Sequence, residues 1–239
     1  MLPSSMVGES LTHNYGLCER DSLAWFAEPL NVISSLLFFV VAIMVFRYMR
    51  RFQEDLHGYK IYDLYAMNAL IFMIGVGSTL YHVHPTPTTE LIDMIPIVSF
   101  IVMFFLSAMR RIVKCSIFET MICFLAFGGG THIVVDQFPQ AMNDSIGYFS
   151  SMASLVAIAF YLNIKRRRTA QAFLVAALIG VISLFFRSVD TALCDMFPMG
   201  THFLWHSCNA LLIYILMVQM VRNVNRRARL MRQASAHFV

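Results

Sequence analysis

Two pairs of polar residues, each spaced four positions apart, lie in or beside long apolar segments of this sequence. One pair is Ser78 and His82, and the other is His202 and His206. Residues four apart lie on the same face of a helix, so the two members of each pair can point at one centre. A charged side chain near the middle of a bilayer costs about 2.5–3.5 kcal/mol on insertion scales, and ionisable groups there usually mark a functional site.

Three imidazoles together with a carboxylate and a hydroxyl predict a catalytic zinc centre. Catalytic zinc takes three protein ligands and leaves one coordination position open, so we expect His82, His202 and His206 to hold the ion. Asp93, at the head of the next apolar run, is then the expected general base toward the attacking water and later the proton donor to the leaving group. Ser78 is expected to hydrogen-bond that water or the developing oxyanion.

Each of these residues also has a purely structural interpretation. Asp93 can serve as a helix cap, because the N-terminal helix dipole favours a carboxylate. Ser78 stands among small residues, which commonly mediate helix packing in membranes. Arg187 and Asp190, three positions apart, are interpreted as a structural ion pair at the rim of the bundle.

The composition excludes a water-soluble globule. The chain of 239 residues is 58% hydrophobic and only 13% charged, whereas soluble domains carry about 25% charged residues. Its mean hydropathy is +0.65. Apolar runs of about 20 residues match the bilayer thickness, and seven are predicted: Pro29–Phe46, Tyr62–Tyr81, Leu91–Met109, Ser116–Val135, Ile146–Ile164, Ala170–Phe186 and Thr201–Val221. Such segments form an all-α antiparallel bundle.

Positive charge predicts the orientation of this bundle. Sixteen of the 18 Lys and Arg residues fall between spans one and two, three and four, five and six, or after span seven. The positive-inside rule places the C-terminus in the cytoplasm and the N-terminus outside. We therefore expect an extracytoplasmic segment over residues 1–28, a seven-span domain over 29–221 and a basic cytoplasmic tail over 222–239. The tail follows a span directly, which favours contact with anionic lipid over nucleic acid.

The residues resemble the alkaline ceramidases and, more widely, the CREST group of seven-helix membrane hydrolases and receptors. The similarity rests on three motifs in order, Gly77–His82, Leu91–Pro96 and His202-x-x-x-His206. Two further segments resemble the ceramidase branch: Cys18-Glu19 followed by Ala27–Ser34, and Arg187–Cys194. The resemblance implies a zinc-dependent amidase that cleaves ceramide to sphingosine and a fatty acid within the membrane.

The resemblance also implies two features of the N-terminal segment. Family members can bind calcium there, for which Glu19, Asp21 and Glu28 would supply oxygens, with a backbone carbonyl from Leu17; Gly16 stands where an acidic ligand is expected. The resemblance further pairs Cys18 with Cys194 in a disulfide.

We thus predict an integral membrane hydrolase acting on a lipid amide, with its site toward the non-cytoplasmic side. Three alternatives stay open at this point. A related hydrolase could act on a phospholipid or another N-acyl lipid. A seven-helix receptor could carry a structural zinc, which usually has four protein ligands. A transporter or haem protein could use the same histidines.

Overall fold

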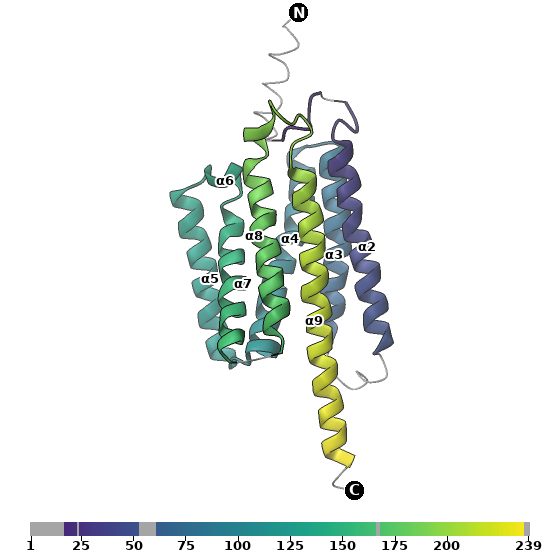
Figure 1. The fold of residues 1–239 in the computed structure, drawn as a ribbon, viewed down its shortest axis with the longest axis vertical. Coiled ribbons are helices and arrows are strands. Elements are labelled where there is room, and N and C mark those ends of the chain that lie inside the picture. The colour runs from purple at the N-terminus through teal and green to yellow at the C-terminus, as the bar shows by residue number, and fades with distance from the viewer. Residues whose placement is uncertain (1–16, 23, 53–60, 166–167, 237–239) are drawn as a thin grey trace, which may run out of the picture.

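The protein is a bundle of membrane-spanning helices (Figure 1). The computed structural model describes residues 17–22, 24–52, 61–165 and 168–236, and the side chains up to residue 234. No strand occurs in this part of the chain. The seven helices long and apolar enough to span a membrane are α2 (Pro29–Arg51), α3 (Tyr62–Val83), α4 (Pro87–Ala108, continued by the π-helical turn η1, Met109–Val113), α5 (Ile117–Gln137), α7 (Gly147–Ile164), α8 (Ala170–Val189) and α9 (His202–Ala236). The predicted fold class is therefore confirmed, and the chain is a multi-pass integral membrane protein.

The long helices pack as neighbours in the order α4, α3, α2, α9, α8, α7 and α5. A short helix α6 (Ala141–Asp144) precedes α7, and a 3-10 turn η2 (Thr191–Leu193) follows α8. Because α9 lies between α2 and α8, the first and last spans are in direct contact (Figure 1). The end of α3 and the start of α9 consequently meet at one end of the bundle, although about 120 residues separate them in the chain.

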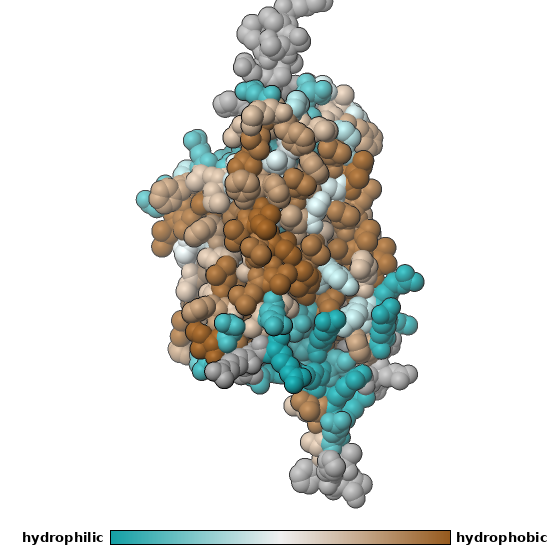
Figure 2. Space-filling model, viewed as in Figure 1, coloured by the Kyte–Doolittle hydropathy of each residue, from teal (hydrophilic) through white to brown (hydrophobic). Residues whose placement is uncertain are grey.

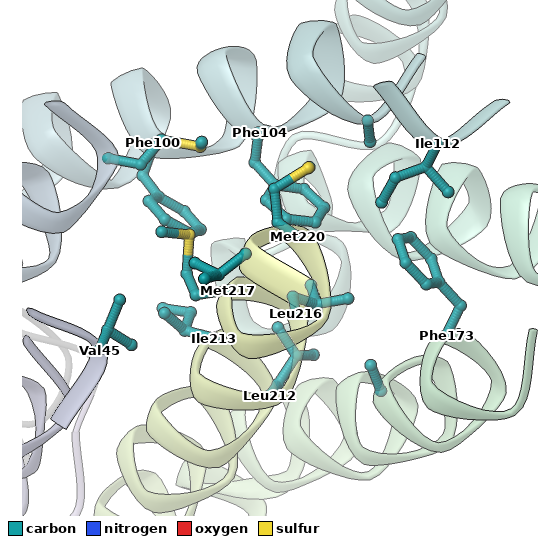
Figure 3. Close-up of a cluster of buried hydrophobic side chains, with 14 of the residues drawn as sticks. Val45, Phe100, Phe104, Ile112, Phe173, Leu212, Ile213, Leu216, Met217 and Met220 are labelled. Carbon is teal, nitrogen blue, oxygen red and sulfur yellow. The ribbon is translucent and has the colours of Figure 1, made fainter. Parts of the chain in front are cut away.

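The apolar core is built around α9, and lipid-facing side chains surround it. Figure 3 shows one face of α9 against α2, α4 and α8, where one buried cluster includes the side chains of Val45, Phe100, Phe104, Phe173, Leu212, Ile213, Leu216, Met217 and Met220. Large apolar residues also cover the outside, for example Ile33, Leu125 and Leu178, each at least 61% exposed. Figure 2 shows apolar side chains over the middle of one face of the molecule, which suits contact with lipid tails rather than water.

Helix α5 lies at the edge of the bundle and is the least buried span. Thr120 is its one buried residue. Glu119 is a charged residue within this apolar segment. It lies in the first turn of α5, where it forms a capping box with Ser116. A Cβ added at Gly128 would meet no atom within 4 Å, so this glycine faces open space.

Helices α3 and α4 approach each other closely at Gly77. A Cβ at this position would collide with the carbonyl oxygen of Ile92 and would lie 2.6 Å from the Cα of Asp93. Pro96 lies four residues after Ile92 and has no N–H, so that carbonyl lacks its usual helical partner. The absence of a side chain at Gly77 thus brings the backbone of α4 against α3 next to Ser78.

Basic residues gather at the end of the bundle opposite the histidines. They include Arg50 and Arg51 at the end of α2, Arg110 and Arg111 in η1, and Lys165 after α7. Helix α9 continues through Ala236, well past the predicted end at Val221, and its last turns project beyond the other helices (Figure 1). Three basic residues counted in the sequence, at positions 60, 166 and 167, lie outside the described residues.

Candidate functional site

The three predicted histidines meet in the interior of the bundle. His82 lies in the last turn of α3, and His202 and His206 lie in the first two turns of α9. All three are at most 4% exposed. Their ring centroids are 4.6–5.2 Å apart, and one nitrogen from each ring lies within 4.8 Å of the others. Within the described residues this is the one group of three or more such side chains that could hold a metal ion.

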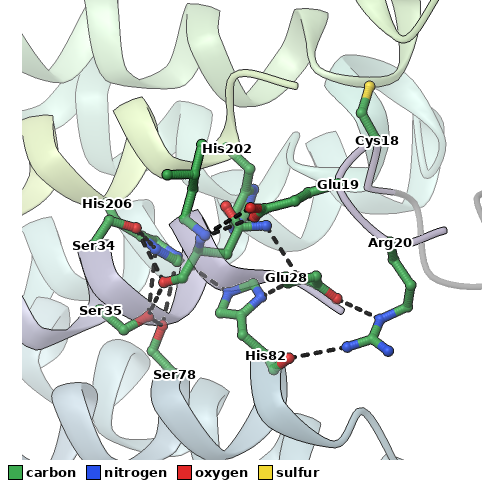
Figure 4. A network of polar contacts seen from close by, with 12 residues as sticks. Cys18, Glu19, Arg20, Glu28, Ser34, Ser35, Ser78, His82, His202 and His206 are labelled. Atoms are coloured by element: carbon green, nitrogen blue, oxygen red, sulfur yellow. Dashed lines mark hydrogen bonds and ion pairs between the residues drawn. The ribbon is translucent and has the colours of Figure 1, made fainter. Parts of the chain in front are cut away.

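Hydrogen bonds orient two of these rings so that their Nε2 atoms face each other (Figure 4). Nδ1 of His82 lies 2.5 Å from Oε2 of Glu28. Nδ1 of His206 lies 2.9 Å from Oγ of Ser34, whose own proton goes to the carbonyl of Asn31 at 3.0 Å. Both Nδ1 atoms therefore donate, which leaves a lone pair on each Nε2. These two Nε2 atoms are 3.3 Å apart, and a cation between them would relieve the repulsion of their lone pairs.

The interpretation of Arg187 and Asp190 as an ion pair is wrong. The carboxylate of Asp190 instead accepts backbone N–H groups of Cys18 at 3.0 Å, Thr201 at 2.5 Å and His202 at 2.9 Å. It thereby binds the N–H groups of Thr201 and His202 at the start of α9, which have no acceptor within the helix. Nη1 of Arg187 lies 2.8 Å from Nδ1 of His202, at the rim of the histidine cluster.

A second network connects α2 with Ser78. Oγ of Ser35 lies 2.7 Å from the carbonyl oxygen of Asn31 and 2.8 Å from Oγ of Ser78. Because Ser35 gives its proton to that carbonyl, Ser78 is the donor in the pair of hydroxyls. Oγ of Ser78 is also 3.5 Å from Nε2 of His206. Ser78 is thus part of a polar network rather than a serine that only packs two helices together.

Asp93 is too far inside α4 to cap it. The N-cap is Thr86, which forms a capping box with Thr89. Asp93 lies on the second turn and lines the same cavity as the three histidines and Ser78, and its buried Oδ1 has no hydrogen-bond partner. A buried carboxylate oxygen without a partner is costly, so it is available for a ligand or a water molecule.

The cavity has a volume of about 140 Å³ and combines this polar wall with an apolar one. The apolar wall is contributed mainly by α4 and α9, through Ile97, Phe100, Ile101, Leu212 and Ile213. Polar groups at one end and hydrocarbon at the other are the features expected of a pocket for an amphiphilic ligand.

The N-terminal segment folds against this end of the bundle. A disulfide joins Cys18 to Cys194, with 2.09 Å between the sulfurs. The carboxylate of Glu19 accepts the backbone N–H groups of Leu30 at 2.6 Å and Asn31 at 2.9 Å, and so caps α2. Burial raises the pKa of Glu19 despite these two bonds. Asp21, also expected to ligate calcium, is exposed.

Glu28 is the third acidic residue of this segment, and it contacts the histidine cluster directly. It is 1% exposed and binds Arg20, Asn31 and His82. Burial raises its pKa, but the hydrogen bond from His82 and the positive charge of Arg20 act against burial, and the pKa falls below its ordinary value.

Sequence reasoning missed the polar side chains that support the histidines. Glu28 was expected to bind calcium, and Ser34 and Ser35 had no assigned role. A signal was present, since Glu28, Asn31 and Ser35 follow one another at intervals of three and four residues. That spacing puts a polar stripe on one face of an otherwise apolar span.

Comparison with known proteins shows the family of this chain. A family model described as Ceramidase matches residues 11–236, nearly the whole chain. The chain belongs to the ceramidase family. Its members hydrolyse ceramide, so this protein is a hydrolase that acts on an amide bond of a lipid. Searches among curated proteins and among solved structures each gave no match.

Proposed function

We propose that this ceramidase is a zinc-dependent intramembrane amidase that cleaves the N-acyl bond of ceramide. The observation that carries the proposal is the pair of Nε2 lone pairs of His82 and His206 facing each other at 3.3 Å, with His202 beside them. Tetrahedral zinc with Zn–N bonds of 2.0–2.1 Å separates its ligand nitrogens by about 3.3–3.4 Å. The spacing of the two nitrogens therefore fits this ion, and imidazole is one of its preferred ligands.

The supporting hydrogen bonds also favour a zinc site. Histidine ligands of metals almost always donate the other ring N–H to a carboxylate, carbonyl or hydroxyl, which fixes the tautomer. Glu28 serves His82 in this way and Ser34 serves His206. With both Nδ1 protons directed outward, the two rings point their lone pairs at one position between them, which suits a cation.

Zinc in this position would polarise the amide carbonyl and make water a stronger nucleophile at neutral pH. We propose that Asp93 removes a proton from the attacking water and then delivers it to the leaving amine, since this residue lines the cavity and its Oδ1 has no hydrogen-bond partner. Ser78 can turn its hydroxyl proton from Ser35 toward the developing oxyanion. Hydrolysis consumes one water and yields sphingosine and a fatty acid.

The shape of the cavity supports a lipid substrate with its amide at the histidines. The apolar wall between α4 and α9 would hold an acyl chain, while Glu90 and Arg187 at the polar end would face the head group. We propose ceramide as the substrate because of the family, and the same pocket would accept other N-acyl lipids of similar shape.

The site is proposed to open on the non-cytoplasmic side. The basic ends of α2, α4 and α7 lie at the far end of the bundle from the histidines, and the positive-inside rule places such clusters in the cytoplasm. The disulfide at the histidine end independently favours an oxidising compartment. Residues 1–28 would then be extracytoplasmic, residues 29–221 would form the membrane domain, and the helical continuation of α9 would begin a cytoplasmic tail.

Metal analysis combined with product identification tests the proposal. Purified protein is expected to contain stoichiometric zinc and to release sphingosine and fatty acid from ceramide. Alanine at His206 should abolish both zinc binding and turnover, whereas alanine at Asp93 should abolish turnover and leave zinc in place. A panel that adds a phospholipid and another N-acyl lipid measures specificity. Full turnover by Asp93→Ala would refute the role assigned to that carboxylate.

A further inference from the structure

The acidic residues expected to bind calcium do not form a calcium site. Both oxygens of Glu19 accept backbone N–H groups at the start of α2, and Asp21 is exposed. The oxygens of Glu28 are bound by Arg20, Asn31 and His82. Among the described residues, no group of three carboxylates converges. The residues present therefore do not fit calcium.

The guanidinium of Arg20 lies between Glu28 and the end of α3 and so occupies one of the acidic side chains expected to bind calcium (Figure 4). The side chain of Arg20 is 1% exposed. Its Nε donates to Oε1 of Glu28 at 2.5 Å, its Nη2 to the carbonyl of His82 at 2.9 Å, and its Nη1 to the carbonyl of Ser22 at 3.2 Å. A carboxylate and backbone carbonyls are the oxygens that calcium selects. In this protein the planar guanidinium of Arg20 donates hydrogen bonds to these oxygens instead.

This arginine holds His82 at two points. Its Nη2 binds the backbone carbonyl of His82, one of the last carbonyls of α3, where a cation is favoured. Its Nε binds one oxygen of Glu28, whose other oxygen accepts Nδ1–H of His82. Without Arg20, the buried Glu28 would keep a negative charge with one oxygen unpaired, which is strongly unfavourable.

We propose that Arg20 is a permanent cation in place of a calcium ion, and that it acts as a positioning residue for His82 through Glu28. The described part of the N-terminal segment, residues 17–22 and 24–28, accordingly binds no calcium and needs none. The part of this proposal that concerns His82 rests on the proposed zinc site, whereas the part that concerns calcium does not.

The first test is a calcium titration of the full-length wild-type protein in detergent. Thermal unfolding is followed in calcium-free buffer and with added millimolar calcium, with magnesium as the control salt. The expected result is the same Tm in all three. A rise in Tm that is specific to calcium would overturn the proposal, whether or not the protein holds zinc or turns over ceramide.

The second test measures zinc affinity by competition with a chelating dye. Arg20→Ala is expected to weaken zinc binding by about 10–100-fold, the usual effect of losing a group that orients a metal ligand. Arg20→Lys, which keeps the positive charge but not the planar guanidinium, should give an intermediate zinc affinity. Arg111→Ala is the matched control, because it removes a partly exposed arginine–carboxylate pair with Asp63 at the other end of the bundle.

The control separates a positioning role from general stability. Arg111→Ala should lower the Tm without changing zinc affinity, whereas Arg20→Ala should change both. Equal zinc affinity in Arg20→Ala and wild type would overturn the positioning role and leave the proposed function intact. If Arg20→Ala does not fold, Arg20→Lys and the calcium titration still decide the question. Wild-type protein without zinc would instead refute the proposed function.

Discussion

Adding a methyl group at Gly77 should impair hydrolysis while leaving the metal site filled. The new Cβ would lie 2.6 Å from the Cα of Asp93, whereas ordinary contact begins at 3.4 Å. Helix α4 must therefore move by at least roughly 0.8 Å, since the carbonyl oxygen of Ile92 would lie closer still, and a misplacement of about 1 Å in a catalytic group can cost about 100-fold in rate. We expect Gly77→Ala to lower kcat for ceramide by one to two orders of magnitude.

The other consequences of this substitution follow from where the histidines lie. Overpacking of this kind typically costs about 1–3 kcal/mol, so the Tm should fall moderately. Zinc content should persist, because α4 carries none of the three histidines. The assay measures turnover, zinc content and thermal unfolding on the same detergent-solubilised preparation.

Gly128→Ala provides the matched control. Its Cβ would meet nothing within 4 Å, and alanine is the better helix former, so activity should equal that of wild type and stability should not fall. Gly77→Ala with a kcat within twofold of that control would refute the claim that the approach of α4 to α3 sets the position of Asp93.

Three further predictions concern the support of the histidines. Ser34→Ala removes the nearer acceptor of Nδ1 of His206 and leaves only the weaker contact with Oγ of Ser35 at 3.4 Å, so zinc affinity should fall by about 10–100-fold in a competition titration. Removing zinc with a chelator should lower the Tm of wild type, because an ion bound only by the folded state stabilises it, while His206→Ala should show no such shift. Asp190→Asn replaces one acceptor oxygen by a donor at the start of α9, which should cost about 1–3 kcal/mol and lower the Tm.

Each of these three predictions can be contradicted by a specific result. Ser207→Ala removes a hydroxyl that donates to the backbone of its own helix, and its zinc affinity should match wild type; the same loss in both serine variants would argue against the role of Ser34. A chelator-induced shift that persists in His206→Ala would place the stabilising ion elsewhere. An unchanged Tm in Asp190→Asn would show that α9 does not need this cap.

Local patterns in the sequence predicted the spans and the three histidines that the structure brings together. Hydropathy located all seven helices, since a bilayer demands about 20 apolar residues whatever the neighbouring helices are. The intervals of four between Ser78 and His82, and between His202 and His206, placed each pair on one helix face. These properties depend only on residues close together in the chain, which is why they could be read in advance.

The tertiary structure alone decided which polar groups surround the histidines. Glu28 turned out to accept Nδ1–H of His82, Arg20 binds the other oxygen of Glu28, and Asp190 caps α9 instead of pairing with Arg187. A buried carboxylate takes whichever donors packing brings within reach, and those donors come from segments far apart in the sequence. Residue types could predict that partners must exist, but only the packing of α2, α3 and α9 determined which ones they are.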